Sequence, residues 1–157
     1  MLVVAAFMSA TPATAEPAGT GQVTYISIYE GGGTGSPNRQ SSIFNDGRVS
    51  IDGQQCQGCR WHAPFRHEFT ASPQLFNDVA RLLTKPVMEQ ASESPCTMQR
   101  AGDGRVLQSV TISDDRGPHP FTFVKTCLSP ELQNARDRMA AADTLIRNAA
   151  EVARRAK

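Results

Sequence analysis

The feature of this sequence that most constrains its fold is a pair of β-hairpins, each followed by a helix. In the first hairpin, residues 42–51, Asp46 and Gly47 stand between apolar segments. This dipeptide favours a tight turn because glycine tolerates a positive φ. The second hairpin comprises strands at 105–113 and 119–126. Strands joined by such short turns pair antiparallel, and blocks of strands followed by helices favour an α+β fold.

Both expected helices begin with a serine followed by a proline. Ser72 and Ser129 are placed to act as N-caps, and the prolines occupy the first helical position, where a missing N–H is tolerated. The first helix should end at Lys85, because the residue before a proline is disfavoured in helical geometry. Residues 87–104 should then form a polar connection. Each helix has one apolar stripe: Leu75, Phe76, Val79, Leu82 and Leu83 in the first, and Leu132, Ala135, Met139, Ala142, Ile146, Ala149 and Ala153 in the second.

A further strand is expected at residues 22–30, where β-branched and aromatic residues dominate. Apolar and aromatic side chains occur on both of its faces, which indicates a strand covered on both sides. Together these elements predict an antiparallel sheet of four to five strands with both helices packed on one face. The long C-terminal helix is expected to extend beyond this sheet from Asn148 onward.

Residues 1–15 have the pattern of an export signal. An apolar run from Leu2 to Met8 is followed by small residues, and Ala13–Ala15 has the small–x–small pattern that signal peptidases accept. No stretch approaches the ~20 apolar residues that a membrane-spanning helix needs. We therefore expect residues 16–157 to form one small α+β domain that is periplasmic or secreted.

The four cysteines, Cys56, Cys59, Cys96 and Cys127, would then lie in an oxidising compartment. An even number of cysteines in a small exported domain favours two disulfides. Cys96 precedes the second hairpin and Cys127 follows it, so one bridge could join these two and another could join Cys56 to Cys59. The alternative pairs Cys56 or Cys59 with a distant cysteine, and the sequence alone does not choose between the connectivities.

The first two cysteines have a second interpretation. With His62 and His67 they form the pattern C-x2-C-x2-H-x4-H, and thiolates with imidazoles are ligands of tetrahedral zinc sites. Copper is a further candidate metal. Cys56 and Cys59 could instead cycle between dithiol and disulfide, although that chemistry usually places the pair at a helix N-terminus. A periplasmic metal-binding or thiol-redox protein is therefore the alternative function.

Residues 60–69, which follow the two cysteines, are rich in aromatic and basic side chains. Such side chains are frequent at binding hot spots. With the neighbouring glycine-rich residues 31–38 they form the candidate binding surface, although large aromatic residues in a small domain also fill the core. The 16 basic and 15 acidic residues give a net charge of +1, which argues against nucleic-acid binding. The candidate surface consists of Arg60, Trp61, Phe65, Arg66 and Phe69, and Tyr25 and Tyr29 could extend it.

The sequence contains no nucleophile elbow, phosphate-binding loop or His-Glu-x-x-His motif. Asp114 and Asp115 lie in the turn of the second hairpin, where aspartates usually cap backbone N–H groups. His119 beside them is expected to be exposed. We therefore expect a disulfide-stabilised, non-enzymatic binding module without a cofactor, whose partner is a protein, a peptide or a component of the cell envelope.

Overall fold

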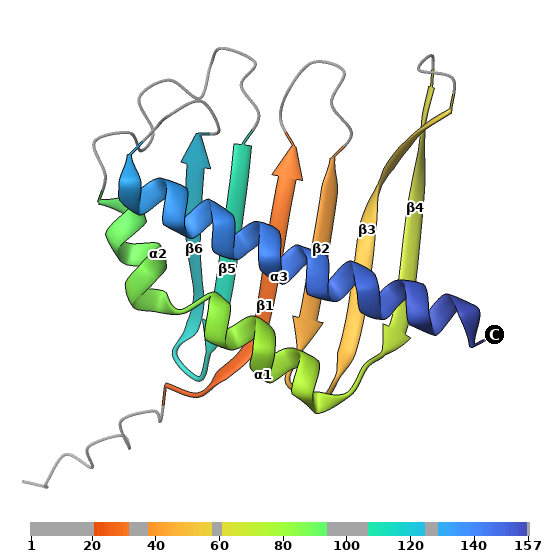
Figure 1. The fold of residues 1–157 in the computed structure, drawn as a ribbon, viewed down its shortest axis with the longest axis horizontal. Helices are drawn as coiled ribbons and strands as arrows, with labels where there is room; N and C mark the ends of the chain where they lie inside the picture. The colour runs from red at the N-terminus through yellow and green to blue at the C-terminus, as the bar shows by residue number, and fades with distance from the viewer. Residues whose placement is uncertain (1–20, 32–37, 58–60, 94–106, 125–128, 157) are drawn as a thin grey trace, which may run out of the picture.

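A computed structural model describes residues 21–31, 38–57, 61–93, 107–124 and 129–156, of which 55–57, 61–63, 107 and 124 are described by their backbone alone. Four strands are followed by two helices, two further strands and a long helix (Figure 1). The elements are β1 (Val23–Gly31), β2 (Arg39–Phe44), β3 (Arg48–Gln57), β4 (Trp61–Thr70), α1 (Pro73–Leu82), α2 (Lys85–Ser92), β5 (Leu107–Asp114), β6 (Gly117–Val124) and α3 (Pro130–Arg155).

The strands form one antiparallel sheet in the order β4-β3-β2-β1-β5-β6. The α+β class is confirmed, but the six strands exceed the expected four to five. The additional strand is β4, in which Phe65, His67 and Phe69 alternate with polar residues. Because a histidine stands between the two phenylalanines, the two-residue period is weak in the sequence. A proline, Pro64, is tolerated because β4 lies at the edge of the sheet.

Both predicted hairpin turns are present. Gly47 closes the β2–β3 turn with φ of 88°, and Gly117 follows the β5–β6 turn with φ of 117°. These are backbone conformations that glycine adopts readily and other residues rarely do. At Gly47 a Cβ atom would also lie 2.6 Å from the carbonyl oxygen of Ala71.

The helices begin where the serine–proline pairs predict. Ser129 caps α3 by accepting a hydrogen bond from the backbone N–H of Leu132 at 3.1 Å, whereas Ser72 occupies the N-cap of α1 without a side-chain bond. The expected polar connection at 87–104 was wrong in its first part, since α2 begins at Lys85. The proline after Lys85 lies in the first turn of α2, where its missing N–H costs no hydrogen bond.

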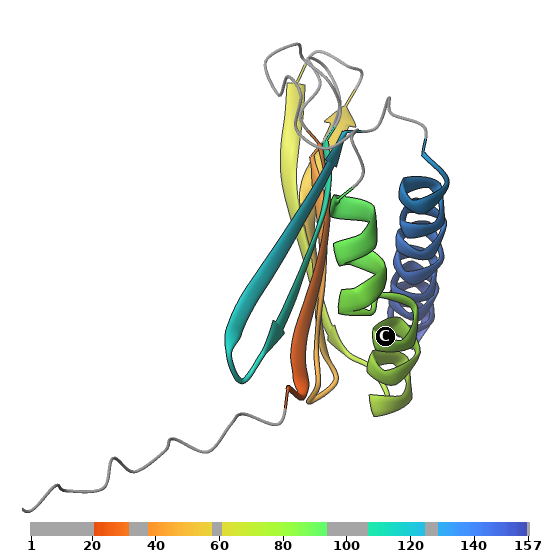
Figure 2. The same cartoon turned by 90° about the vertical axis from the view of Figure 1, so that its left-hand side faces the viewer.

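All three helices pack on one face of the sheet (Figures 1 and 2). Ile26 and Ile28 of β1 face them and are buried, while Tyr25 and Tyr29 on the other face are half-buried. The expectation that this strand is covered on both sides was therefore wrong for the described residues. The strand side of the core consists mainly of Ile26, Ile28, Ile43, Val49, Ile51, Val110, Ile112 and Phe123.

Helix α3 crosses the sheet from β6 to beyond β4 (Figure 1). Its predicted stripe is buried at Leu132, Ala135, Met139, Ala142 and Ile146. The helix stays packed further than expected, because Ala150 is only 3% exposed, and the exposed end begins after it, with Val152 at 68%. None of the helices in the described part of the chain has the length and hydrophobicity that a membrane span requires.

Candidate binding site on the uncovered sheet face

The side of the sheet opposite the helices, here called the uncovered face, has no described helix over it (Figure 2). Because side chains alternate along a strand, the register determines which residues it presents. One row across the sheet contains hydroxyl residues on four neighbouring strands, followed by an acidic residue on β4. This row is Thr111, Ser27, Ser42, Ser50 and Glu68.

The uncovered face is hollowed over β1–β4 into a depression of about 610 Å³, within the size range of small-molecule sites. Its lining combines aromatic rings, hydroxyl groups and paired charges. The lining residues are Tyr25, Ser42, Phe44, Arg48, Val49, Ser50, Asp52, Arg66, Glu68, Phe69 and Thr70.

An aromatic pair lies at one end of this depression. The rings of Tyr25 and Phe44, which face each other across β1 and β2, have centroids 4.8 Å apart at an angle of 47°. The Arg48 guanidinium lies 4.6 Å from the Phe44 centroid and donates to Asp46 at 2.7 Å. Hydrogen bonds from the backbone N–H and the guanidinium of Arg48 lower the pKa of the Asp46 carboxyl. This end of the depression therefore offers an apolar ring surface, and the positive charge of Arg48 beside it is already paired with Asp46.

The other end of the depression carries a second arginine. Arg66 Nη2 lies 2.5 Å from Glu68 Oε1, and its Nε lies 3.5 Å from Asp52 Oδ1. The hydrogen bond with Glu68 raises the pKa of Arg66. Asp52 also accepts a hydrogen bond from Ser50 at 2.7 Å. Both arginines of the depression thus lie against carboxylates.

Polar groups between the two ends bond to one another. Tyr25 Oη lies 3.2 Å from Ser42 Oγ, which in turn donates to Ser27 Oγ at 3.3 Å. Gln40 Nε2 donates to Ser27 at 2.9 Å. Ser27 and Ser42 are both only 5% exposed, although they lie on the uncovered face. Such a network holds the side chains of the depression in fixed positions.

The residues of the binding surface expected from the sequence do not all lie on the same face of the sheet. Arg66 lies in the depression, but Phe65 and Phe69 pack against the core from the helix side, with Phe69 also reaching the edge of the depression. Arg60 lies outside the described residues, and Trp61 is described only by its backbone, which pairs with Gln57. Tyr25 also lines the depression, but Phe44 and Arg48 were not predicted beside it, because their proximity depends on strand register.

The cysteine and histidine positions are only partly described. The backbone of Cys56 lies opposite that of His62 in the β3–β4 ladder, while His67 pairs with Ile51, five positions further along. Cys59, Cys96 and Cys127 lie outside the described residues, so the predicted disulfides and the metal cluster stay predictions. Among the residues that are described, no group of three or more His, Cys, Asp or Glu side chains could hold a metal ion.

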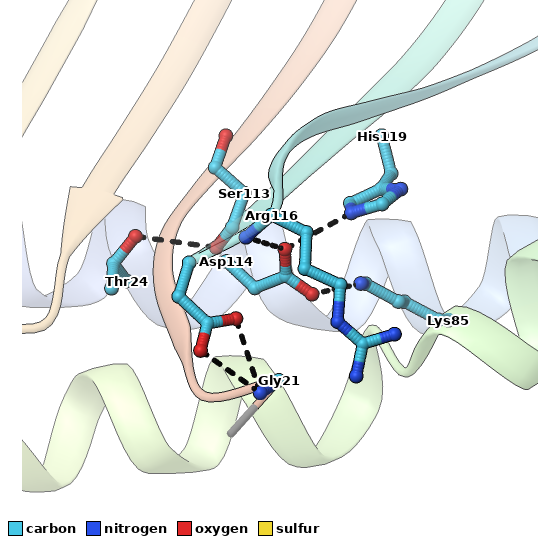
Figure 3. Close-up of polar contacts among 8 residues, drawn as sticks. Gly21, Thr24, Lys85, Ser113, Asp114, Arg116 and His119 are labelled. Atoms are coloured by element: carbon cyan, nitrogen blue, oxygen red, sulfur yellow. Dashed lines mark hydrogen bonds and ion pairs between the residues drawn. The ribbon is translucent and has the colours of Figure 1, made fainter. Parts of the chain in front are cut away.

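A second polar cluster surrounds Asp114 at the β5–β6 turn (Figure 3). Lys85, from the start of α2, binds Oδ2, while the Arg116 backbone N–H donates to Oδ1 at 2.9 Å and His119 Nε2 lies 3.1 Å from the same oxygen. His119, expected to be exposed, is thus half-buried beside Asp114. The neighbouring Asp115 accepts hydrogen bonds from the Gly21 N–H at 3.1 and 3.2 Å.

The electrostatics of this cluster favour a structural role. The hydrogen bond from Lys85 holds the pKa of Asp114 well below its usual 3.8, against the opposing effect of burial. The carboxylate has no exposed surface, yet its cover is thin, since the side chains of Lys85 and His119 are 23% and 36% exposed. Its oxygens are engaged by α2, by the turn and by β6. The predicted capping role of the turn aspartates is confirmed, whereas Lys85 was missed because it lies 29 residues away.

A third polar cluster lies between α3 and the sheet. Asp143 is buried on α3 and accepts hydrogen bonds from Arg39 Nη2 at 2.5 Å and Ser41 Oγ at 2.9 Å, and Arg147 Nε lies 3.0 Å away. A polar hollow of about 440 Å³ borders it. This cluster was not predicted from the sequence. Its signal is an acidic residue next to Ala142, within the apolar stripe of the helix.

Comparison with known proteins adds no family to this description. No family model matches the chain, and a search of curated proteins finds no match.

Proposed function

We propose that this chain is a non-enzymatic binding domain whose ligand site is the depression on the uncovered face. The observation that carries this proposal is the hollow of about 610 Å³, which joins the Tyr25–Phe44 ring pair to two arginines. Aromatic and arginine side chains are the residues most often found at the energetic centres of interfaces. The residues that line the site come from four neighbouring strands, so the hydrogen-bonded sheet fixes the positions of these residues relative to one another.

The arrangement of charges restricts the classes of ligand that the site can bind. Arg48 is paired with Asp46, and Arg66 with Glu68 and Asp52. A strongly charged ligand would have to displace these partners, whereas a neutral ligand can bond to their remaining donors and acceptors. Ring faces next to hydroxyls and carboxylates suit a ligand rich in hydroxyl or amide groups. Among the partners expected from the sequence, we therefore favour a cell-envelope component, with an extended peptide as the comparison.

Nuclear magnetic resonance titration tests this proposal. Oligosaccharides of N-acetylglucosamine, the neutral sugar of peptidoglycan, are the first probe, and a pool of short extended peptides is the second probe. The oligosaccharides should shift the amide signals of β1–β4. Phe44→Ala should weaken this binding about tenfold, while Thr122→Ala, at the opposite end of the sheet, should leave it unchanged. Shifts that map elsewhere, or no shifts with either probe, would refute the proposed site.

We also propose export, with two disulfides, on the strength of residues 1–15 and the four cysteines. Mass spectrometry of the chain recovered from the periplasm or medium should show cleavage after Ala15 and no thiol that reacts with an alkylating agent. A full-length chain retained in the cytosol would refute export.

A second candidate function uses Cys56, Cys59, His62 and His67. The backbone pairing of Cys56 with His62 favours it, whereas His67 lies five positions further along the ladder, on the helix side of the sheet. Protein purified without chelator should then contain stoichiometric zinc or copper, or two reactive thiols at Cys56 and Cys59. Absence of both metal and reactive thiols would exclude the metal-binding and thiol-redox alternatives.

A further inference from the structure

The two edges of the sheet are protected to different degrees. An unpaired edge strand offers its N–H and C=O groups to any other strand, and natural proteins often block such edges with proline. The β6 edge carries Pro118 and Pro120 on alternate residues, opposite Ser113 and Thr111. The β4 edge has one proline, Pro64, and the six residues after it have none.

The direction of the β4 hydrogen-bonding groups follows from their neighbours. The N–H of Gln54 donates to Asn38, away from β4, so the Gln54–Pro64 pair is not hydrogen-bonded. At the other end, the N–H of Ala71 donates to Gly47 on the β3 side. Because these directions alternate along an antiparallel strand, residues 66, 68 and 70 point their N–H and C=O groups to the outer edge. No described strand pairs with them there.

We propose that the β4 edge binds the β4 edge of a second copy of this chain, in an antiparallel pair whose two-fold axis passes at His67. In this register, Arg66 lies opposite Glu68 of the second copy, and Glu68 lies opposite Arg66 of that copy. Both positions have outward-directed backbone groups, so each of the two contacts is a hydrogen-bonded pair. The edge is thus self-complementary in charge as well as in hydrogen bonding.

Side-chain positions on both faces fit this register. Arg66 and Glu68 lie on the uncovered face and are 67% and 61% exposed, so they are accessible to a second copy. On the helix side, the same register places Phe65 opposite Phe69 of the second copy, and aromatic cross-strand pairs stabilise antiparallel sheets. A register centred on Glu68 would instead place two glutamates opposite each other, which is destabilising.

The end of α3 provides a further surface at this edge. The helix passes beyond β4 (Figure 1), and Val152 in its last turns is the one large hydrophobic side chain that is exposed in the described part of the chain. A shallow hollow of about 420 Å³ joins Val152 to Phe69 and Leu75. A second copy added to β4 would lie under this projecting end. Two six-stranded sheets would then form one continuous sheet, with the two depressions next to the shared axis.

Charge reversal tests the register. Sedimentation velocity of the full chain over a dilution series should show a monomer–dimer equilibrium. Glu68→Arg and Arg66→Glu each create two like-charge pairs, so each should weaken the dimer at least about tenfold. The double variant, with both charges exchanged, should dimerise as the unchanged chain does. A mixture of the two single variants should form a heterodimer, because all of its facing charges are opposite.

A proline pair tests the backbone bonds separately. Glu68→Pro removes an N–H that points away from β3, so it should abolish the dimer and leave the circular dichroism spectrum unchanged. Thr122→Pro, on the already blocked β6 edge, is the matched control and should dimerise normally. If Glu68→Pro does not fold, the charge-reversal variants Glu68→Arg and Arg66→Glu decide whether the β4 edge forms the dimer. A chain that is monomeric throughout the series, a dimer insensitive to both reversals, or a monomer that gains mass only with extended peptides would overturn the proposal.

Discussion

Replacement of Asp143 by alanine tests whether the buried polar cluster stabilises the packing of α3 on the sheet. The carboxylate is 9% exposed and accepts hydrogen bonds from Arg39 and from Ser41, which is itself 1% exposed. Asp143→Ala removes the acceptor and leaves the Ser41 hydroxyl buried without its partner. The same change removes the ion pairs with Arg39 and Arg147.

The magnitude follows from these contacts. An unsatisfied buried hydroxyl costs about 1–3 kcal/mol. Arg39 and Arg147 reach solvent, with side chains 31% and 52% exposed, so each lost ion pair adds only about 0.2–1 kcal/mol. Together these values give a loss of about 3 kcal/mol in the free energy of unfolding. For a domain of this size that loss lowers the melting temperature by about 10 °C.

Urea denaturation at pH 7 measures this change, with the midpoint lowered and the slope unchanged. Asp137→Ala is the matched control, because Asp137 lies on the same helix, is exposed and bonds only Gln133 among its described partners. Both substitutions raise the helix propensity equally, so the difference between them isolates the buried contacts. Equal stabilities of the two variants would refute the reasoning.

Three further predictions concern other parts of the fold. Gly47→Ala should lower the free energy of unfolding by about 1–3 kcal/mol, because it combines a positive φ with a Cβ 2.6 Å from the Ala71 carbonyl; Gly117→Ala, where nothing lies within 4 Å, should cost less in the same urea assay. Lys85→Met should destabilise the protein at pH 7, and the difference from the unchanged chain should shrink as the pH falls below about 4, because the stability linked to the lowered pKa of Asp114 is complete above the unfolded value of 3.8 and is lost progressively below it; equal urea midpoints at pH 7 would contradict this. Truncation before Arg154 should leave the melting temperature nearly unchanged, since Arg154, Arg155 and Ala156 are exposed, and a loss of several degrees would show that this end is docked.

The local signals in the sequence predicted the elements they act on directly. Asp46 with Gly47 identified a turn, and Ser129 with the following proline identified the start of α3, because turns and caps depend on a few adjacent residues. The pair at Lys85 was interpreted as the end of a helix, since the sequence alone does not show that a second helix begins there. The period of β4 was missed because its helix-side positions mix phenylalanine with His67.

The candidate site was less predictable, because it depends on register. Arg66 was identified, but Tyr25 and Phe44 come together only when β1 and β2 pair in one alignment. A shift of one residue would turn each side chain to the other face. Asp114 and Lys85 illustrate the same limit, since their contact joins a turn to α2, a helix that was not predicted from the sequence.

The position of α3 after all six strands has a consequence for biosynthesis. This helix supplies Leu132, Met139 and Ile146 to the core, so the apolar side of the sheet lacks much of its cover until α3 emerges from the ribosome. Contacts between distant parts of a chain also form slowly. We therefore expect the nascent polypeptide to stay unfolded while its strands are synthesised, and to become compact only once α3 is available to cover them.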